Sequence, residues 1–86
     1  MGVSKLIRGQ IVLSKKGRDK GRYLAVTSAD QNGVYVVDGK ERPICRPKRK
    51  NPKHVDATKQ CLSEESFATN RALRKALREW EEKMKL

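Results

Sequence analysis

The stretch GQIVLSKKGRDKGRYLAVTSADQNGVYVVDG, residues 9–39, decides the fold of this chain. Its apolar and β-branched residues predict two strands, Gln10–Leu13 and Arg22–Thr27, joined by the loop Lys15–Gly21. The loop has four cations and two glycines in seven residues. Glycine lets the backbone turn with positive φ, and the cations offer charge to a partner rich in phosphate. The sequence therefore predicts a strand pair whose connecting loop meets such a partner.

Three more strands are predicted downstream. Val34–Val37 follows a turn at 30–33, where Asn-Gly tolerates the left-handed backbone of a tight hairpin. Pro43–Cys45 and His54–Ala57 are expected to be short, because the prolines around them limit any ladder. Five short strands predict a mainly β protein, with a small curled sheet or barrel. The expected core is Ile11, Leu13, Leu24, Val26, Val34, Val36, Ile44 and Val55.

The last part of the chain predicts a helix over Glu64–Lys83. Ser63 is the expected N-cap, and acidic residues occupy the first turn, where the helix dipole favours negative charge. Leu62 and Phe67 have the spacing of a hydrophobic staple. The apolar residues that follow at helical spacing are Leu73, Leu77, Trp80 and Met84. We expect this stripe to dock on the outside of the sheet, and a partner-binding helix is the alternative. The predicted division is a β domain over 1–60 and a helix over 61–86.

A second face of this helix is basic, with Arg71, Arg74 and Arg78 on one flank. One interpretation is a solvated face with the ion pairs Arg78–Glu82 and Lys75–Glu79. The alternative is a second contact with nucleic acid. The sequence leaves both open.

The composition points to an acidic partner. The 86 residues have a formal net charge of +11, and only 36% are hydrophobic, which leaves no room for a large enclosed substrate cavity. Residues 1–60 have 15 cations and 5 anions, whereas residues 61–86 have 6 and 5. Nucleic acid is the first candidate partner and an anionic membrane the second. No apolar run approaches the roughly 20 residues that span a bilayer, so we expect no membrane partner.

A second basic segment, residues 46–53, has five cations in eight residues. Its prolines are expected to hold it extended, so that its charges follow a phosphate backbone. Gly17 and Gly21 are the predicted structural turn residues of the loop. The candidate RNA-binding residues of the two segments are Lys15, Lys16, Arg18, Lys20, Arg22, Arg46, Lys48, Arg49, Lys50 and Lys53.

Other chemistry is poorly supported. Cys45, His54 and Cys61 lack the spacing of a zinc site, so no metal or other cofactor is expected. We expect two reduced thiols, at least one partly buried, and a disulfide is the less favoured alternative. Asp19 is interpreted as a turn former or the partner of a nearby cation. No catalytic set is visible, so we predict that the protein is not an enzyme. Aromatic residues are too scarce for stacking single-stranded bases, which favours folded RNA.

Residues 9–39 resemble the KOW motif of ribosomal proteins and transcription elongation factors, with Gly21 at the central glycine. With the segment RPKRKNPKH at 46–54, residues 8–58 resemble the bacterial KOW-domain RNA-binding proteins, which are related to the "fourteen-e" proteins of the archaeal and eukaryotic large ribosomal subunit. The resemblance implies an SH3-like barrel that binds ribosomal RNA. The cations to which it assigns this role are Lys16, Arg18, Lys20, Arg22, Lys48, Arg49 and Lys50.

The function expected from the sequence is therefore non-enzymatic binding to ribosomal RNA of the large subunit, through backbone phosphates. The expected protein is a cytoplasmic, ribosome-associated monomer, with other proteins of the large subunit as further candidate partners. The alternative is a protein-interaction module that docks on the transcription or translation machinery.

Overall fold

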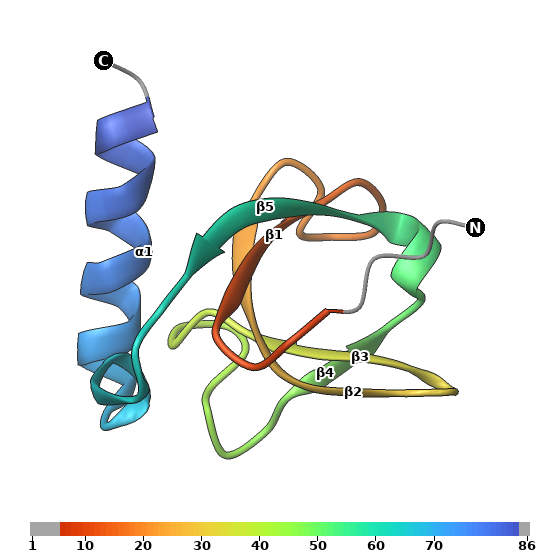
Figure 1. Cartoon of the computed structure of the whole chain (residues 1–86), viewed down its shortest axis with the longest axis horizontal. Coiled ribbons are helices and arrows are strands. Elements are labelled where there is room, and N and C mark those ends of the chain that lie inside the picture. Colours follow the sequence, from red (N-terminus) through yellow and green to blue (C-terminus); the bar gives the residue numbers. More distant parts are fainter. Residues whose placement is uncertain (1–5, 85–86) are drawn as a thin grey trace.

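The computed structural model describes residues 6–84 and consists of an antiparallel sheet and a C-terminal helix (Figure 1). The predicted mainly β class with a C-terminal helix is confirmed. The elements are β1 (Gln10–Ser14), β2 (Tyr23–Asp30), β3 (Gly33–Val37), β4 (Lys48–Lys50), a 3-10 turn η1 (Pro52–His54), β5 (Val55–Cys61), a second 3-10 turn η2 (Glu64–Phe67) and α1 (Asn70–Met84).

The five strands form one sheet in the order β4-β3-β2-β1-β5. In Figure 1, β1 and β5 arch over β3 and β4, while the long strand β2 belongs to both halves. The sheet is not closed into a barrel, because β4 and β5 remain its two edges over the described residues. The edge strand β4 is only three residues long, and Pro47 and Pro52, which cannot donate to a ladder, lie close to its two ends.

Two irregularities bend the sheet. The pairing of β2 with β3 shifts between Val26 and Ser28, and that of β1 with β5 shifts between Gln10 and Val12. At the second shift the Thr58 hydroxyl donates to the Ile11 carbonyl at 2.7 Å, which satisfies a backbone acceptor outside the regular ladder. Bulges of this kind increase twist and curvature, so five short strands wrap around a small core.

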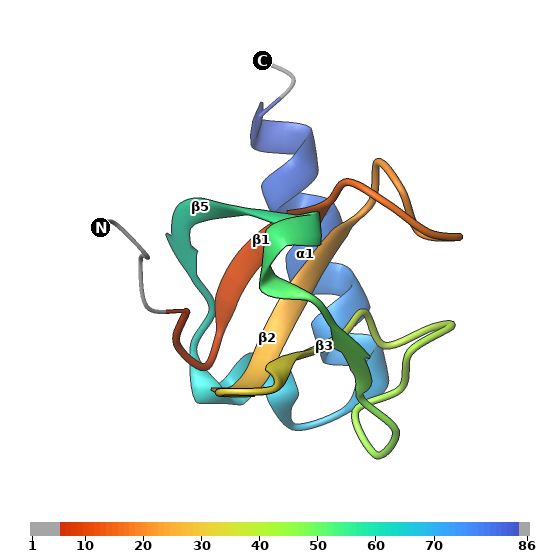
Figure 2. The same cartoon turned by 90° about the vertical axis from the view of Figure 1, so that its right-hand side faces the viewer.

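Both faces of the sheet are buried. The inner cluster contains Val12, Leu24, Val26, Val34, Val36 and Val55. The outer cluster contains Ile11, Ala25 and Val37 together with Phe67, Leu73 and Leu77, so α1 packs on the outside of the sheet as predicted (Figure 2). Two predicted core residues, Leu13 and Ile44, are only partly buried. The buried part of the apolar stripe of α1 ends at the half-buried Trp80, because Met84 is 59% exposed.

One predicted strand was wrong. Residues 43–45 form a turn, in which Arg46 N donates to the Pro43 carbonyl at 2.9 Å. The fourth strand lies instead inside the basic segment, at Lys48–Lys50, where Lys50 pairs with Val34 and Lys48 with Val36. The expectation that the prolines hold the whole segment 46–53 extended was wrong, because Lys48–Lys50 is extended but Pro52 begins the 3-10 turn η1. The free edge of β3 supplies the hydrogen-bonding partner of the extended part.

The predicted hairpin turn at 30–33 is present, but its physical reason was wrong. Neither Asn32 nor Gly33 has positive φ. The Asp30 carboxylate accepts hydrogen bonds from Asn32 N at 2.8 Å and Gly33 N at 3.1 Å. A side-chain cap therefore closes this turn, rather than a left-handed backbone.

The predicted single helix over 64–83 is divided into η2 and α1. Ser63 precedes η2 without a side-chain cap, and the cap of α1 is Thr69, whose hydroxyl accepts from Ala72 N at 3.0 Å. Arg8 fixes η2, because its Nε lies 2.7 Å from Glu64 Oε2 and its guanidinium stacks 4.6 Å from the Phe67 ring centre. Leu62 and Phe67 both join the outer cluster, but they flank the 3-10 turn η2, so they are not a staple at the start of an α-helix.

The division of the chain at residue 60 stays a prediction, and the outer cluster is shared by the sheet and α1. The ends of the predicted division, residues 1–5 and 85–86, lie outside the described residues. Within residues 6–84, α1 is neither long enough nor apolar enough to cross a lipid bilayer.

Candidate nucleic-acid interface

The basic loop between β1 and β2 has a defined backbone. Gly21 N donates to the Ser14 carbonyl at 2.8 Å, and Ser14 N donates to the Arg22 carbonyl at 2.9 Å, so the strand pair continues to the loop. Gly17 has φ of +91° and Gly21 has φ of +85°, the left-handed region that disfavours residues with a Cβ. The loop's turn geometry therefore depends on glycine, as the sequence predicted.

Asp19 organises the loop from inside. Its side chain is only 4% exposed, and its Oδ1 accepts from Lys50 Nζ at 2.9 Å and from the Ser14 hydroxyl at 3.1 Å. Arg42 Nε lies 4.0 Å from its other carboxylate oxygen. Asp19 is therefore the partner of neighbouring cations, in agreement with the interpretation of the sequence.

The electrostatics of Asp19 reflect two opposed effects. Burial by itself would raise the pKa of Asp19, because it penalises the charged form. The hydrogen bonds from Lys50 and Ser14, together with the charge of the ammonium group, outweigh burial and hold the pKa of Asp19 below its ordinary value. The carboxylate is thus ionised at neutral pH, and the loop is tied to β4 by a charged hydrogen bond.

Lys50 joins the two cation-rich segments. Its ammonium group donates to the Lys16 carbonyl at 2.9 Å in addition to Asp19, and its side chain is only 9% exposed. A second hydrogen bond joins the start of the loop to the residue that follows the basic segment, because Lys15 N donates to the His54 carbonyl at 2.8 Å. The loop 15–21 and the segment 46–53 therefore lie side by side, although they are far apart in the sequence. We call them together the loop–β4 surface.

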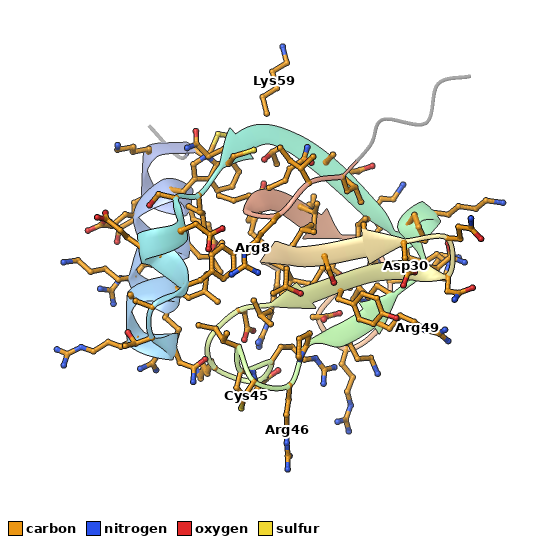
Figure 3. All side chains as sticks on the ribbon, turned by 60° about the horizontal axis from the view of Figure 1, so that its bottom comes forward. Arg8, Asp30, Cys45, Arg46, Arg49 and Lys59 are labelled. Carbon is orange, nitrogen blue, oxygen red and sulfur yellow. The ribbon has the colours of Figure 1, made fainter. Side chains whose placement is uncertain are left out.

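The predicted RNA-binding residues fall into two groups. Three have carboxylate partners: Lys50 with Asp19, Lys15 Nζ with Asp56 Oδ1 at 3.2 Å, and Arg22 with Glu41 at 3.2 Å. Among the described residues, the other seven are exposed and form no salt bridge: Lys16, Arg18, Lys20, Arg46, Lys48, Arg49 and Lys53. Figure 3 shows Arg46 pointing away from the protein, on the side opposite Lys59.

Lys50 points inward and stabilises the loop through its contacts with Asp19 and the Lys16 carbonyl. Its ammonium group already has two acceptors and little contact with solvent. Its contact with RNA stays a prediction, and the seven exposed cations are better placed for that contact. The sequence analysis did not distinguish Lys50 from its basic neighbours, because a run of lysine and arginine does not reveal which side chain turns inward.

The cysteine and histidine residues do not come together. Cys45 and Cys61 are free thiols and both are exposed, so the expectation that at least one is partly buried was wrong. Over residues 6–84, no three His, Cys, Asp or Glu side chains are grouped so that they could hold a metal ion.

A second basic feature lies beside the loop–β4 surface. A groove of about 930 Å³ runs between α1 and the start of β2, and its floor includes Tyr23 and Leu77. Its cations are Arg22, Lys40, Arg71, Arg74, Lys75 and Arg78, and its carboxylates are Asp38, Glu81 and Glu82. The ion pairs Arg78–Glu82 and Lys75–Glu79, which the helical spacing suggested, are not among the salt bridges of the described residues.

The sequence had recognised only one wall of this groove, the arginine flank of α1. Arg22 and Lys40 also line this groove but come from the sheet part of the chain, and only the docking of the helix brings them near that flank.

Comparison with known proteins adds no family assignment: no protein-family model matches the chain, and no curated protein sequence matches it.

Proposed function

We propose that this protein is a non-enzymatic RNA-binding protein that holds ribosomal RNA of the large subunit through its backbone phosphates. One observation carries the proposal. The buried Asp19–Lys50 pair clamps two cation-rich segments together, and seven exposed cations of these segments form no salt bridge among the described residues. Cations that are held together and not neutralised by the protein favour an external polyanion.

The resemblance of residues 8–58 to KOW domains supports the same proposal and extends it to the fold. Five short antiparallel strands that curl around one apolar cluster are compatible with an SH3-like domain of the KOW type, with β4 and β5 as open edges. The resemblance also points to large-subunit ribosomal RNA as the partner and to a cytoplasmic, ribosome-associated monomer.

Structured RNA fits this surface better than single strands do. Stacking of unpaired bases needs exposed aromatic rings, and Tyr23 and Trp80 pack against each other with ring centres 4.7 Å apart. Phosphates of a folded RNA require only positive charge at suitable positions.

The rival function, docking on a protein through the apolar stripe of α1, receives less support. Leu73 and Leu77 are buried against the sheet, and Trp80 is half-buried beside them. The stripe is thus largely used within the protein, and it leaves no extended apolar face on α1 for a partner.

The test is co-sedimentation with ribosomes. At native expression levels and low salt, the protein should migrate with large subunits in a sucrose gradient, and high salt should release it. The double variant Arg18→Ala/Lys20→Ala should move toward the top of the gradient, because it removes two exposed loop cations. The control Lys59→Ala/Lys83→Ala removes the same charge from β5 and from the end of α1 and should behave as the wild type.

Wild-type protein found only at the top of the gradient at low salt would refute the ribosomal assignment. An equal shift of both double variants would show that net charge, rather than the loop–β4 surface, determines the association.

A further inference from the structure

We propose that the groove between α1 and the β2 side of the sheet is a second RNA-backbone site, continuous with the loop–β4 surface. This inference rests on the proposed function and adds α1, which lies outside the residues that resemble a KOW domain. It gives the C-terminal helix a direct role in binding.

The two sites meet at the end of the basic loop. Gly21 and Arg22 line the groove, and Gly21 is also the last residue of the loop that Asp19 anchors to β4. A phosphate backbone that leaves the loop therefore meets the groove at Gly21 and Arg22. Glu41 lies at this junction, because it pairs with Arg22 at 3.2 Å, and both side chains are at least half exposed. Phosphate can compete for such an exposed pair at little cost.

The cations that line the groove come from two parts of the protein, α1 and the sheet. Arg71, Lys75 and Arg78 follow one flank of α1, and the helical rise of about 1.5 Å per residue spreads the first and last over roughly 10 Å of the axis. Arg22 and Lys40 line the same groove from the sheet part of the chain. Like charges gathered in a concave surface reinforce one another's potential, which favours a bound polyanion over scattered counterions.

The carboxylates of the groove define where the site ends. Asp38 is occupied by its own turn, because its Oδ1 accepts from Lys40 N at 2.8 Å and Arg42 N at 2.9 Å. Glu81 and Glu82 lie beyond Arg78, toward the C-terminal end of α1. Their charge repels phosphate, so the RNA backbone occupies the part of the groove between Arg71 and Arg78.

The floor of the groove also suits a nucleotide. Tyr23 is half-buried, and the edge-on contact with Trp80, at an interplanar angle of 74°, fixes its ring. Because Trp80 holds the ring, Tyr23 is no stacking platform for an unpaired base, but its exposed part offers van der Waals contact to a ribose of the bound backbone. An acidic protein segment would use the cations but would gain less from this ring, so we favour RNA.

The experiment measures how affinity for a fluorescein-labelled RNA hairpin depends on salt, using fluorescence anisotropy of the full chain. Each phosphate contact contributes roughly 0.7 to 0.9 to the slope of log affinity against log salt. Arg71→Ala/Arg78→Ala should therefore make the slope shallower by about 1.4 to 1.8. Arg18→Ala/Lys20→Ala should have a similar effect, whereas the control Lys59→Ala/Lys83→Ala should leave the slope unchanged. All four residues of the two test variants are exposed, and thermal melting checks that the variants stay folded.

The outcomes separate the two proposals. If only the loop variant changes the slope, the proposed function stands and the groove site is refuted. If neither variant differs from the control, RNA binding through these surfaces is refuted altogether. Photocrosslinking to a 4-thiouridine hairpin should label Tyr23 in the wild type and lose this label in the groove variant. A groove variant that loses affinity for poly-glutamate but keeps its RNA slope would overturn the assignment in favour of an acidic protein.

Discussion

The Asp19–Lys50 pair allows a sharp test, because the structure makes it both the anchor of the loop and a buried charge pair. Asp19→Asn keeps the shape of the side chain and a possible hydrogen bond to Ser14, but it removes the negative charge. The Lys50 ammonium, on a side chain only 9% exposed, then has only neutral acceptors, the Lys16 carbonyl at 2.9 Å and the amide oxygen that replaces Asp19 Oδ1. Removing one partner of a fully buried pair costs about 3–5 kcal/mol.

We expect a smaller loss here, about 2–3 kcal/mol at pH 7, since the ammonium keeps neutral hydrogen-bond acceptors and some contact with water. A domain of this length has a free energy of unfolding of roughly 4–13 kcal/mol, so the variant loses a large share of it. The melting temperature should fall by about 10–20 °C. Urea unfolding followed by circular dichroism measures the change at constant temperature.

The matched variants are Lys50→Met and the double variant Asp19→Asn/Lys50→Met. Lys50→Met leaves the carboxylate without its ammonium partner, whereas the double variant leaves no charge unpaired. The double variant should therefore lose less stability than the sum of the two single changes, with a coupling of about 1–3 kcal/mol. Additive losses, or a cost of Asp19→Asn below about 0.5 kcal/mol, would refute the role assigned to the pair.

The pH dependence gives an independent reading of the same pair. The pKa of Asp19 is lowered in the folded protein, so the unfolded chain takes up the proton at higher pH than the folded one. The contribution of Asp19 is fully present above about pH 4, the ordinary range of an aspartate, and is lost as the pH falls toward the folded-state pKa. The stability difference between wild type and Asp19→Asn should thus shrink below pH 4. A constant difference down to pH 2 would contradict the lowered pKa.

Three other substitutions test the fold by urea unfolding. Gly21→Val should cost at least about 1–2 kcal/mol, because Gly21 has φ of +85° and a Cβ there strains the backbone even in open space; an unchanged midpoint would contradict that need for glycine. Gly39→Ala should cost more than Gly21→Ala, because Gly39 also has positive φ and its Cβ would overlap the Asn70 carbonyl oxygen at the start of α1; equal costs would show that this approach of the helix is not tight. Leu73→Ala should cost about 2–5 kcal/mol, because the side chain is fully buried between α1 and the sheet; a loss below 1 kcal/mol would mean that the helix contributes little to the core.

Much of the local structure could be predicted from the sequence. The alternation in residues 10–37 located β1, β2 and β3 to within a few residues, because period-two apolar patterns depend on neighbours in the chain. The positive φ of Gly17 and Gly21 followed from the loop composition in the same way. The helical stripe correctly placed Leu73 and Leu77 against the sheet, since a narrow apolar face must be covered.

The failures involve long-range partners. The sequence predicted a strand at residues 43–45 and an extended basic run at residues 48–50. A strand forms only where it can pair with the edge of another strand, and the edge of β3 pairs with Lys48–Lys50. The division between η2 and α1 was also missed, and η2 is contacted by Arg8, more than fifty residues earlier in the chain, through Glu64 and Phe67. Neither the place of the fourth strand nor the division of the helix could be predicted from the local sequence.

The sequence by itself determined that this protein is small, mainly β and strongly basic, with its cations concentrated in two segments and along one flank of a helix. Only the tertiary structure decided which cations are available to a partner. Lys50 turns inward to Asp19 and joins the two segments, and the docking of α1 brings its arginine flank near Arg22 and Lys40. The physical reason is that charge is a property of each residue, whereas burial, pairing and concavity arise only when distant segments pack together.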